Sequence, residues 1–315
     1  MLNDLQFAFY ITAPIFCILA LGIVLKRRGL ITDLFAKTGS DLVFKVTLPC
    51  LLFVKLVKTD FRHDLPLTLV GYAVLGTLVV FFVLDRFATP LIDKREQRGV
   101  FVQGAFRGNM GIIGLAYCLS AFGDAVIAAA SIYLAVMTTL YNVLAVLTLS
   151  RHRQAELDEQ RKLTLLVDIG KNPLILSIAL GVVVSLSGIK MPFLVLNTGN
   201  YLAQMTLPLA LLCAGASIRM QEFQASPPLY WSTLAKLVVV PLLLTSGGVL
   251  IGLRGPELGV LYLMSSSPTA AASYPMTLAL GGNQHLAAAI IAATALGSLV
   301  STTCGIFILR SYGLI

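Results

Sequence analysis

Nearly the whole chain consists of apolar stretches that are each about as long as a bilayer is thick. A helix needs ~20 mostly apolar residues to cross the hydrocarbon core of a membrane. Ten such stretches can be marked, at residues 7–25, 39–58, 65–85, 99–121, 125–149, 172–188, 199–218, 229–252, 257–281 and 286–310. Only 12% of the residues are charged, whereas a soluble domain carries about a quarter. We therefore predict an all-α membrane protein with ten transmembrane helices in a lipid bilayer.

Lysine and arginine are spread unevenly over the connections between these stretches. If the N-terminus lies outside, about fourteen of them fall in inner connections and about five in outer connections or at the C-terminus, as the positive-inside rule requires. Both termini then lie outside. The net charge of +8 follows from this bias and does not indicate a nucleic-acid partner. Lys26, Arg27 and Arg28 follow the first stretch, whereas a signal peptide carries its charges before the apolar segment.

The two halves of the sequence align with each other at one constant offset of 159 residues. Pro14 then meets Pro173, and the Thr-Leu-Pro tripeptide ending at Pro49 meets the one ending at Pro208. Single matches of Ala or Gly mean little in this composition, but two prolines and a tripeptide in register indicate a repeat.

This repeat divides the chain into two units of five helices. Residues 1–149 and 172–315 form the units, and residues 150–171 form a charged cytoplasmic linker. Because five is an odd number, the second unit enters the membrane from the opposite side. Inverted repeats of this kind are typical of secondary transporters.

The fourth and ninth stretches carry helix-weakening residues near their centres. Gly108 and Asn109 lie in the fourth stretch, and the offset maps Asn109 onto Pro268 in the ninth. Proline has no N–H and clashes with the carbonyl four residues before it. Two interrupted helices that cross would bring half-helix ends together at the midplane, where their N-terminal ends favour anions. The simpler alternative is that the glycines allow close packing and the proline only kinks its helix.

Arg107 is the second unusual residue of the fourth stretch. A central arginine costs ~2.5–3.5 kcal/mol on insertion scales, so it requires a cavity or a partner. One alternative is that it bonds to backbone carbonyls or to Gln103, one turn away; the other is that it binds a negatively charged solute. The second alternative predicts a substrate site formed by Arg107, Gly108, Asn109, Met110, Ser266, Ser267, Pro268 and Thr269.

Other polar and helix-bending residues are assigned smaller roles. Gln103 and Gln204 are candidates for lining the transport pathway. Pro49, Pro208 and Pro275 are expected to kink their helices.

Several charged residues are expected to lie at the membrane surface. Asp41 and Lys45 are spaced as a surface ion pair. Lys236 is only seven residues into its stretch and is expected to extend to the interface. His152, like the other two histidines, is expected in a loop or at the interface. The five cysteines have no metal-ligand spacing, and no catalytic motif is present, so we predict neither cofactor nor metal and no enzyme activity.

Four motifs, in this order, resemble the auxin efflux carrier family over the whole chain. They are "LGIVLKRRGL" (21–30), "TLPCLLF" (47–53), "FRGNMGIIGL" with a following "FGD" (106–124), and "SSSPTAAASYPM" (265–276). The short basic linker resembles that of bacterial members, which implies the cytoplasmic (inner) membrane. The resemblance implies a ten-helix fold, shared with bile-acid sodium symporters, in which the fourth and ninth helices cross at Asn109 and Pro268. Helices 1, 2, 6 and 7 would form a scaffold that dimerises, and the other six a mobile, elevator-type transport domain.

The motifs and the resemblance together favour a secondary transporter of small organic anions. The family's substrates imply a mono- or dicarboxylate such as malonate or malate. A sodium-coupled, bile-acid-like symporter and a ligand-gated anion channel or receptor are the alternatives. The sequence leaves open whether a proton or a sodium ion is coupled to transport.

Overall fold

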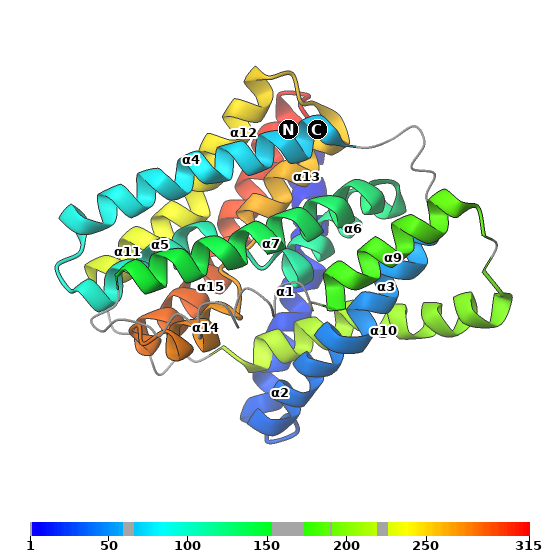
Figure 1. The fold of residues 1–315 in the computed structure, drawn as a ribbon, viewed down its shortest axis with the longest axis horizontal. Helices are drawn as coiled ribbons and strands as arrows, with labels where there is room; N and C mark the ends of the chain where they lie inside the picture. The colour runs from blue at the N-terminus through cyan, green and yellow to red at the C-terminus, as the bar shows by residue number, and fades with distance from the viewer. Residues whose placement is uncertain (1, 59–65, 153–172, 190, 219–225) are drawn as a thin grey trace.

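The computed structural model describes residues 2–58, 66–152, 173–189, 191–218 and 226–315, which form helices and no β-strand (Figure 1). The α-helices are α1 (Leu2–Arg27), α2 (Asp33–Leu42), α3 (Leu48–Val57), α4 (Leu67–Leu91), α5 (Arg95–Phe106), α6 (Leu115–Phe122), α7 (Ile127–Arg151), α9 (Pro173–Ser187), α10 (Phe193–Ala216), α11 (Pro227–Leu234), α12 (Val240–Leu250), α13 (Gly255–Ser266), α14 (Ser273–Ala279) and α15 (Gln284–Ser311). Short 3₁₀ or π segments complete them: η1 (Val43–Thr47), η2 (Met110–Gly114), η3 (Gly123–Val126) and η5 (Ala235–Val239).

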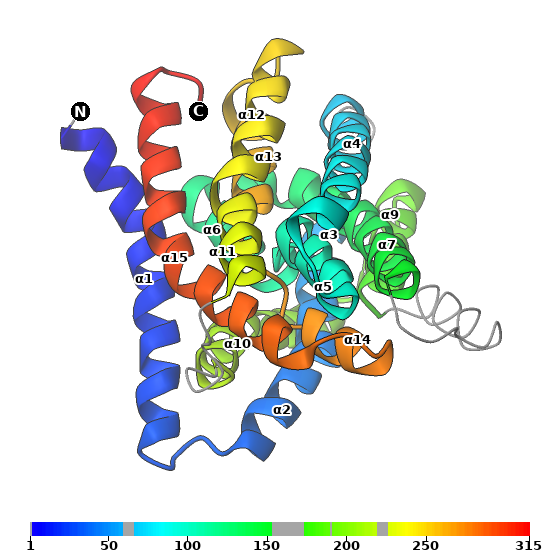
Figure 2. The ribbon, with the colours of Figure 1, turned by 90° about the vertical axis from the view of Figure 1, so that its left-hand side faces the viewer.

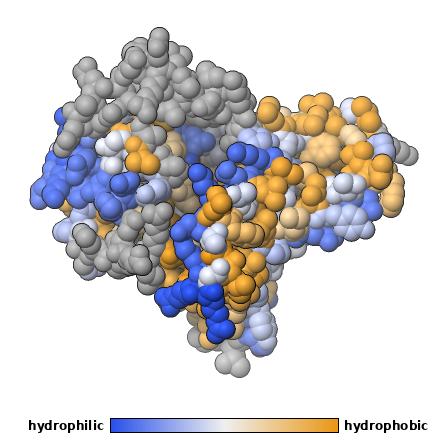
Figure 3. Space-filling model, turned by 90° about the horizontal axis from the view of Figure 1, so that it is seen from below, coloured by the Kyte–Doolittle hydropathy of each residue, from blue (hydrophilic) through white to orange (hydrophobic). Residues whose placement is uncertain are grey.

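Each of the ten ranges marked from hydropathy falls on one or more of these helices. Within the described residues, five helical segments are long and apolar enough to cross a membrane: Asp4–Arg27, Leu67–Leu91, Met110–Arg151, Pro227–Leu250 and Gln284–Ser311. Large apolar side chains are also exposed elsewhere, above all on α10, where Phe193 is 82% exposed. Apolar side chains dominate the projecting part at the right of Figure 3. The surface is therefore that of an integral membrane protein.

Glycine allows close packing in two helix pairs, α1 with α10 and α3 with α9. In the pair of α1 and α10, a Cβ atom on Gly215 would lie 2.0 Å from the carbonyl oxygen of Leu19, and one on Gly22 would lie 2.3 Å from that of Leu212. The pair of α3 and α9 is similar, because a Cβ on Gly181 would lie 2.9 Å from the Cβ of Leu56. Small residues at helix interfaces are the usual means of close approach in membranes.

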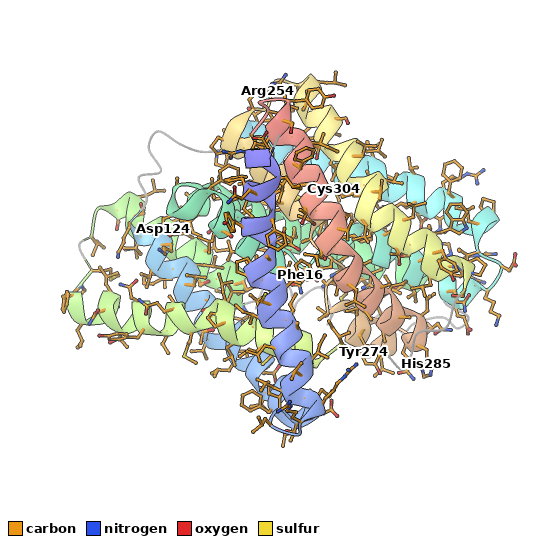
Figure 4. The ribbon with its side chains drawn as sticks, turned by 180° about the vertical axis from the view of Figure 1, so that it is seen from behind. Phe16, Asp124, Arg254, Tyr274, His285 and Cys304 are labelled. Atoms are coloured by element: carbon orange, nitrogen blue, oxygen red, sulfur yellow. The ribbon has the colours of Figure 1, made fainter. Side chains whose placement is uncertain are left out.

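The first and last helices lie side by side (Figures 2 and 4). In Figure 4, α1 carries the labelled Phe16 and α15 the labelled Cys304. The hydroxyls of Thr12 and Thr303 lie 2.8 Å apart between them, and Arg310 Nε lies 3.4 Å from Asp4 Oδ1. Both chain ends therefore lie at the same end of the molecule (Figure 2).

A buried carboxylate fastens α4 to the end of α7. Asp85 accepts hydrogen bonds from Thr148 Oγ1 at 2.9 Å and Arg151 at 2.5 Å, and its Oδ1 lies 2.9 Å from Nε2 of His152. His152, which was expected in a loop or at the interface, is the capping residue that follows α7, and its ring is buried beside Asp85. The charge of Arg151 and the hydrogen bonds from Thr148 and His152 make burial of this carboxylate tolerable.

We predict that Gly215→Ala lowers stability by about 1–3 kcal/mol, because its methyl group would push α1 away from α10. The matched control is Gly71→Ala on α4, where nothing lies within 4 Å of the added atom and alanine is the better helix former. Thermal unfolding of the detergent-purified proteins measures the stability of both variants against the wild type. A Gly215→Ala protein that melts like the wild type would contradict the packing described for this pair.

We also predict that stability falls as the pH drops below about 6.5, in part through His152. Burial lowers the pKa of this histidine, against the opposing effect of Asp85, below its ordinary value of 6.5. The histidine of the unfolded chain therefore binds a proton at a higher pH than the histidine of the folded protein does. The free energy of unfolding decreases as the pH falls below the unfolded pKa of about 6.5. His152→Gln keeps a donor for Asp85 but does not titrate, so its melting temperature should fall less than the wild type's between about pH 8 and 5. His285→Gln, at an exposed position, should keep the wild-type dependence. If the melting temperatures of His152→Gln and the wild type fall equally over this pH range, His152 does not contribute to the pH dependence.

Candidate functional site

Two helical segments are interrupted where they run past each other. One interruption separates α5 from η2 at residues 107–109, and the other separates α13 from α14 at residues 267–272. The open segments pair as a short antiparallel bridge between Gly108 and Thr269. Asn109 N donates to Pro268 O at 2.7 Å, and Ala270 N donates to Arg107 O at 3.0 Å. We call this paired region, residues 107–109 and 267–270, the crossover.

The sequence around Pro268 explains why α13 ends there. Proline has no N–H to give to Met264 O, four residues before it, and the hydroxyl of Ser267 donates to that carbonyl instead, at 2.7 Å. The next N–H, of Thr269, donates to the hydroxyl of Thr294 on α15 at 3.0 Å. Hydroxyl side chains thus replace the helical partners that the interruption removes, as buried backbone groups in a membrane require.

The two segments approach so closely at Gly108 that any larger residue would have to displace its neighbours. A Cβ atom on Gly108 would lie 2.5 Å from Ser267 Oγ and 3.0 Å from Lys236 Nζ. The side chain of Thr269 reaches across to donate to Gly104 O at 2.7 Å. The crossover is therefore held by bonds from both segments and from neighbouring helices.

A cavity of about 470 Å³ opens beside the crossover, within the size range of small-molecule sites. Its polar lining includes Arg107, Asn109, Tyr141 and Asn142, and its apolar lining includes Met276. The full lining is completed by Phe44, Lys45, Gly108, Met110, Gly111, Leu134, Thr138, Pro173, Leu174, Ala270, Ala271 and Ala272.

Arg107 is the buried positive charge within this lining, whereas Lys45, which also lines the cavity, is exposed and paired with Asp41. Arg107 caps α5 with an extended backbone (φ −82°, ψ 99°), and its side chain is 6% exposed. One guanidinium nitrogen donates to Asn142 Oδ1 at 2.5 Å, and another contacts the sulfur of Met276. Both partners are uncharged, and within the described residues Arg107 forms no ion pair. The guanidinium therefore keeps its full charge at the wall of a cavity.

Comparison of the sequence with known proteins identifies a family of membrane proteins. A family model described as membrane transport protein matches residues 7–306. The chain belongs to this family, the auxin efflux carrier family. Members of it transport solutes, so the protein is a membrane transporter and not an enzyme.

Curated relatives cover the chain almost from end to end. The uncharacterized transporter YfdV of Escherichia coli (strain K12) is 24% identical over 306 residues, which are 94% of this chain and 96% of that protein. The uncharacterized transporter MJ1031 of Methanocaldococcus jannaschii is 24% identical over 303 residues, 93% of each chain. The whole chain, and not one segment of it, therefore resembles these transporters.

The structure separates the eight predicted site residues into two groups. Arg107, Gly108, Asn109 and Met110 line the cavity. The residues at positions 266–269 are buried behind the lining, which is formed on that side by the alanines at 270–272. The hydroxyls of this second group bond to backbone carbonyls at 2.7–3.4 Å.

The residues predicted outside the site also differ in their placement. Gln103 is buried and accepts from Thr277 Oγ1 at 3.1 Å, so it is not the partner of Arg107. Gln204 is exposed on α10 and is not part of the cavity lining. Pro49 follows the π segment η1, whereas α10 continues past Pro208. Pro275 is the third residue of α14.

Lys236 corrects one prediction from the sequence. It does not extend to the interface but is completely buried in η5, where Nζ donates to Ser265 O at 2.9 Å. By contrast, Lys45 and Asp41 form the expected exposed pair, 3.4 Å apart. Asn142, the partner of Arg107, was also missed, although an amide in an apolar stretch is a visible signal. Among the residues described, no three His, Cys, Asp or Glu side chains are placed to hold a metal.

We predict that Gly108→Ala loosens the crossover, because its methyl group cannot fit beside Ser267 Oγ. Hydrogen–deuterium exchange of the amides of residues 107–112 and 269–272 should be faster than in the wild type, as the bridging bonds open more often. Gly111→Ala is the control, because the nearest atom would lie at an ordinary 3.5 Å. Adding Ser267→Gly to Gly108→Ala should slow exchange again. If the exchange rates of Gly108→Ala equal those of the wild type, the two segments of the crossover do not pack closely at Gly108.

Proposed function

We propose that the protein is a secondary active transporter of small organic anions, of which mono- and dicarboxylates such as malonate or malate are the best candidates. The observation that carries this proposal is the buried, charged and ion-pair-free guanidinium of Arg107 at the wall of the cavity. An arginine can bind a carboxylate through two parallel hydrogen bonds. Its neutral partners leave that capacity to a solute, which can bind and then leave.

The surroundings of Arg107 suit an anion with a small apolar body. Ala270, Ala271 and Met276 provide apolar contact, while Asn109 and Tyr141 provide neutral hydrogen-bonding groups. A low-dielectric wall strengthens each charge-assisted bond relative to water.

We further propose ten transmembrane helices arranged as an inverted repeat of two five-helix units. In support, residues that the offset of 159 relates contact each other at the crossover: Asn109 bonds to Pro268, and Gly108 packs against Ser267. Residues on a two-fold axis contact their own equivalents in this way. The pair α1–α10 likewise corresponds to the pair α9–α3, and Gly29 and Gly188 share positive φ angles of 77° and 70°.

This arrangement supports alternating access by one part of the molecule against another. We propose that α1–α3, α9 and α10 form a scaffold and that α4–α7 and α11–α15 form the transport domain. The homodimer, the inner membrane and the external termini belong to the same proposal. The position of both chain ends at one end of the molecule agrees with external termini.

The test is carboxylate uptake by purified variants in proteoliposomes. Arg107→Ala should raise the half-saturating concentration by at least about 100-fold, or about 3 kcal/mol, and Arg107→Lys by about tenfold, because lysine loses the bidentate geometry. Arg86→Ala, at an exposed position of α4, should behave as the wild type. Saturable uptake also separates a carrier from a channel.

Asn142→Asp provides a sharper variant that leaves Arg107 in place. It puts a carboxylate of the same shape at the oxygen that now lies 2.5 Å from the guanidinium. That carboxylate should neutralise Arg107 and abolish substrate binding while the protein keeps its melting temperature. Undiminished affinity in folded Arg107→Ala and Asn142→Asp proteins would make the arginine a structural residue and end the proposal.

A further inference from the structure

Lys236 is a buried charge that anion binding does not use. It lies in η5, a π-helical turn that ends just before Pro241 in α12, and its side chain is 0% exposed. Within the described residues it forms no ion pair, and Nζ donates to the carbonyl oxygen of Ser265 at 2.9 Å. A buried ammonium without a counter-ion is costly, so its surroundings must favour a cation.

The interruption of α13 creates such surroundings. In an uninterrupted helix, Ser265 O would accept from the N–H of Thr269, four residues later. That N–H is instead bonded to Thr294 Oγ1, so the carbonyl of Ser265 is available. It lies in the last turn of α13, where the helix dipole places partial negative charge. A positive charge is favoured at that position.

The ammonium group also lies beside the other interrupted segment, at Gly108. A Cβ on Gly108 would lie 3.0 Å from Nζ, and the same atom would lie 2.5 Å from Ser267 Oγ and 3.2 Å from Met264 O. Nζ therefore lies near a hydroxyl and backbone carbonyls at the meeting point of both segments. Oxygen atoms of unwound backbone and helix C-terminal ends are the groups that coordinate coupling cations in transporters with interrupted helices.

We propose that the ammonium group of Lys236 occupies, from within the chain, the cation site formed by the end of α13, so that no sodium ion is needed there. The lysine holds the crossover together at all times, and transport proceeds without sodium. This second consequence rests on the proposed transport function, whereas the occupied cation site does not. The side chain acts on the crossover and not on the solute, so Lys236 is a positioning residue.

The experiment compares melting temperatures in sodium chloride, methylammonium chloride and choline chloride at equal ionic strength. The proteins are the detergent-purified wild type, Lys236→Ala, Lys236→Met and the control Lys37→Ala, which removes an exposed lysine of α2. Wild type and Lys37→Ala should melt alike in all three salts. Lys236→Ala should melt lowest in choline and gain on the order of 5 °C in sodium or methylammonium, because a small cation can enter the vacated space. Lys236→Met should show no such gain, since its side chain still fills that space.

Each other outcome overturns the proposal. A sodium-specific gain in the wild type would mean that the site is not already occupied. A Lys236→Ala protein that melts alike in all three salts, or that cannot be obtained folded in any of them, would mean that no free cation replaces the ammonium. These measurements need no substrate, so an incorrect substrate assignment leaves them intact. In proteoliposomes, carboxylate uptake should be sodium-independent for the wild type and sodium-dependent for Lys236→Ala; sodium-dependent uptake by the wild type would contradict the proposal.

Discussion

The whole site depends on one constraint, which is that no backbone N–H or C=O can remain unpaired in the interior of a membrane. Two interrupted helices violate that constraint unless their open segments satisfy each other. Here they do so through the bonds of Asn109 to Pro268 and of Ala270 to Arg107. The interruptions are tolerated because they occur together, and the cavity lies beside them.

Two positive charges lie at this crossover, and their partners give them different roles. Arg107 contacts an amide oxygen and a thioether at the wall of a cavity, so its charge is open to a solute. Lys236 contacts a backbone carbonyl and has no exposed surface, so its charge is used within the protein. The proposed roles, binding for Arg107 and positioning for Lys236, therefore rest on the groups that each side chain contacts and not on its charge alone.

The helical fold and the positions of the two interruptions could be predicted from local sequence. Apolar length placed the helices, and Pro268 and Gly108 marked the interruptions, because both residues act on the backbone of their own segment. The contacts of Arg107 and Lys236 could not be predicted, since Asn142, Met276 and Ser265 come from other helices. Lys236 was expected at the interface because it lies near the start of its apolar stretch. Its ammonium group instead lies where the π turn before Pro241 directs it and where the carbonyl of Ser265 accepts its hydrogen bond.

The mutual pairing at the crossover also has a consequence for the order in which the chain is made. Arg107 and Asn109 leave the ribosome about 160 residues before Pro268 and Ala270. At a synthesis rate of roughly 5–20 residues per second, the first interruption lacks its partners for roughly 10–30 s. During that time its open backbone must stay near water or a translocation machine. Insertion of the first half is therefore completed only by the synthesis of the second.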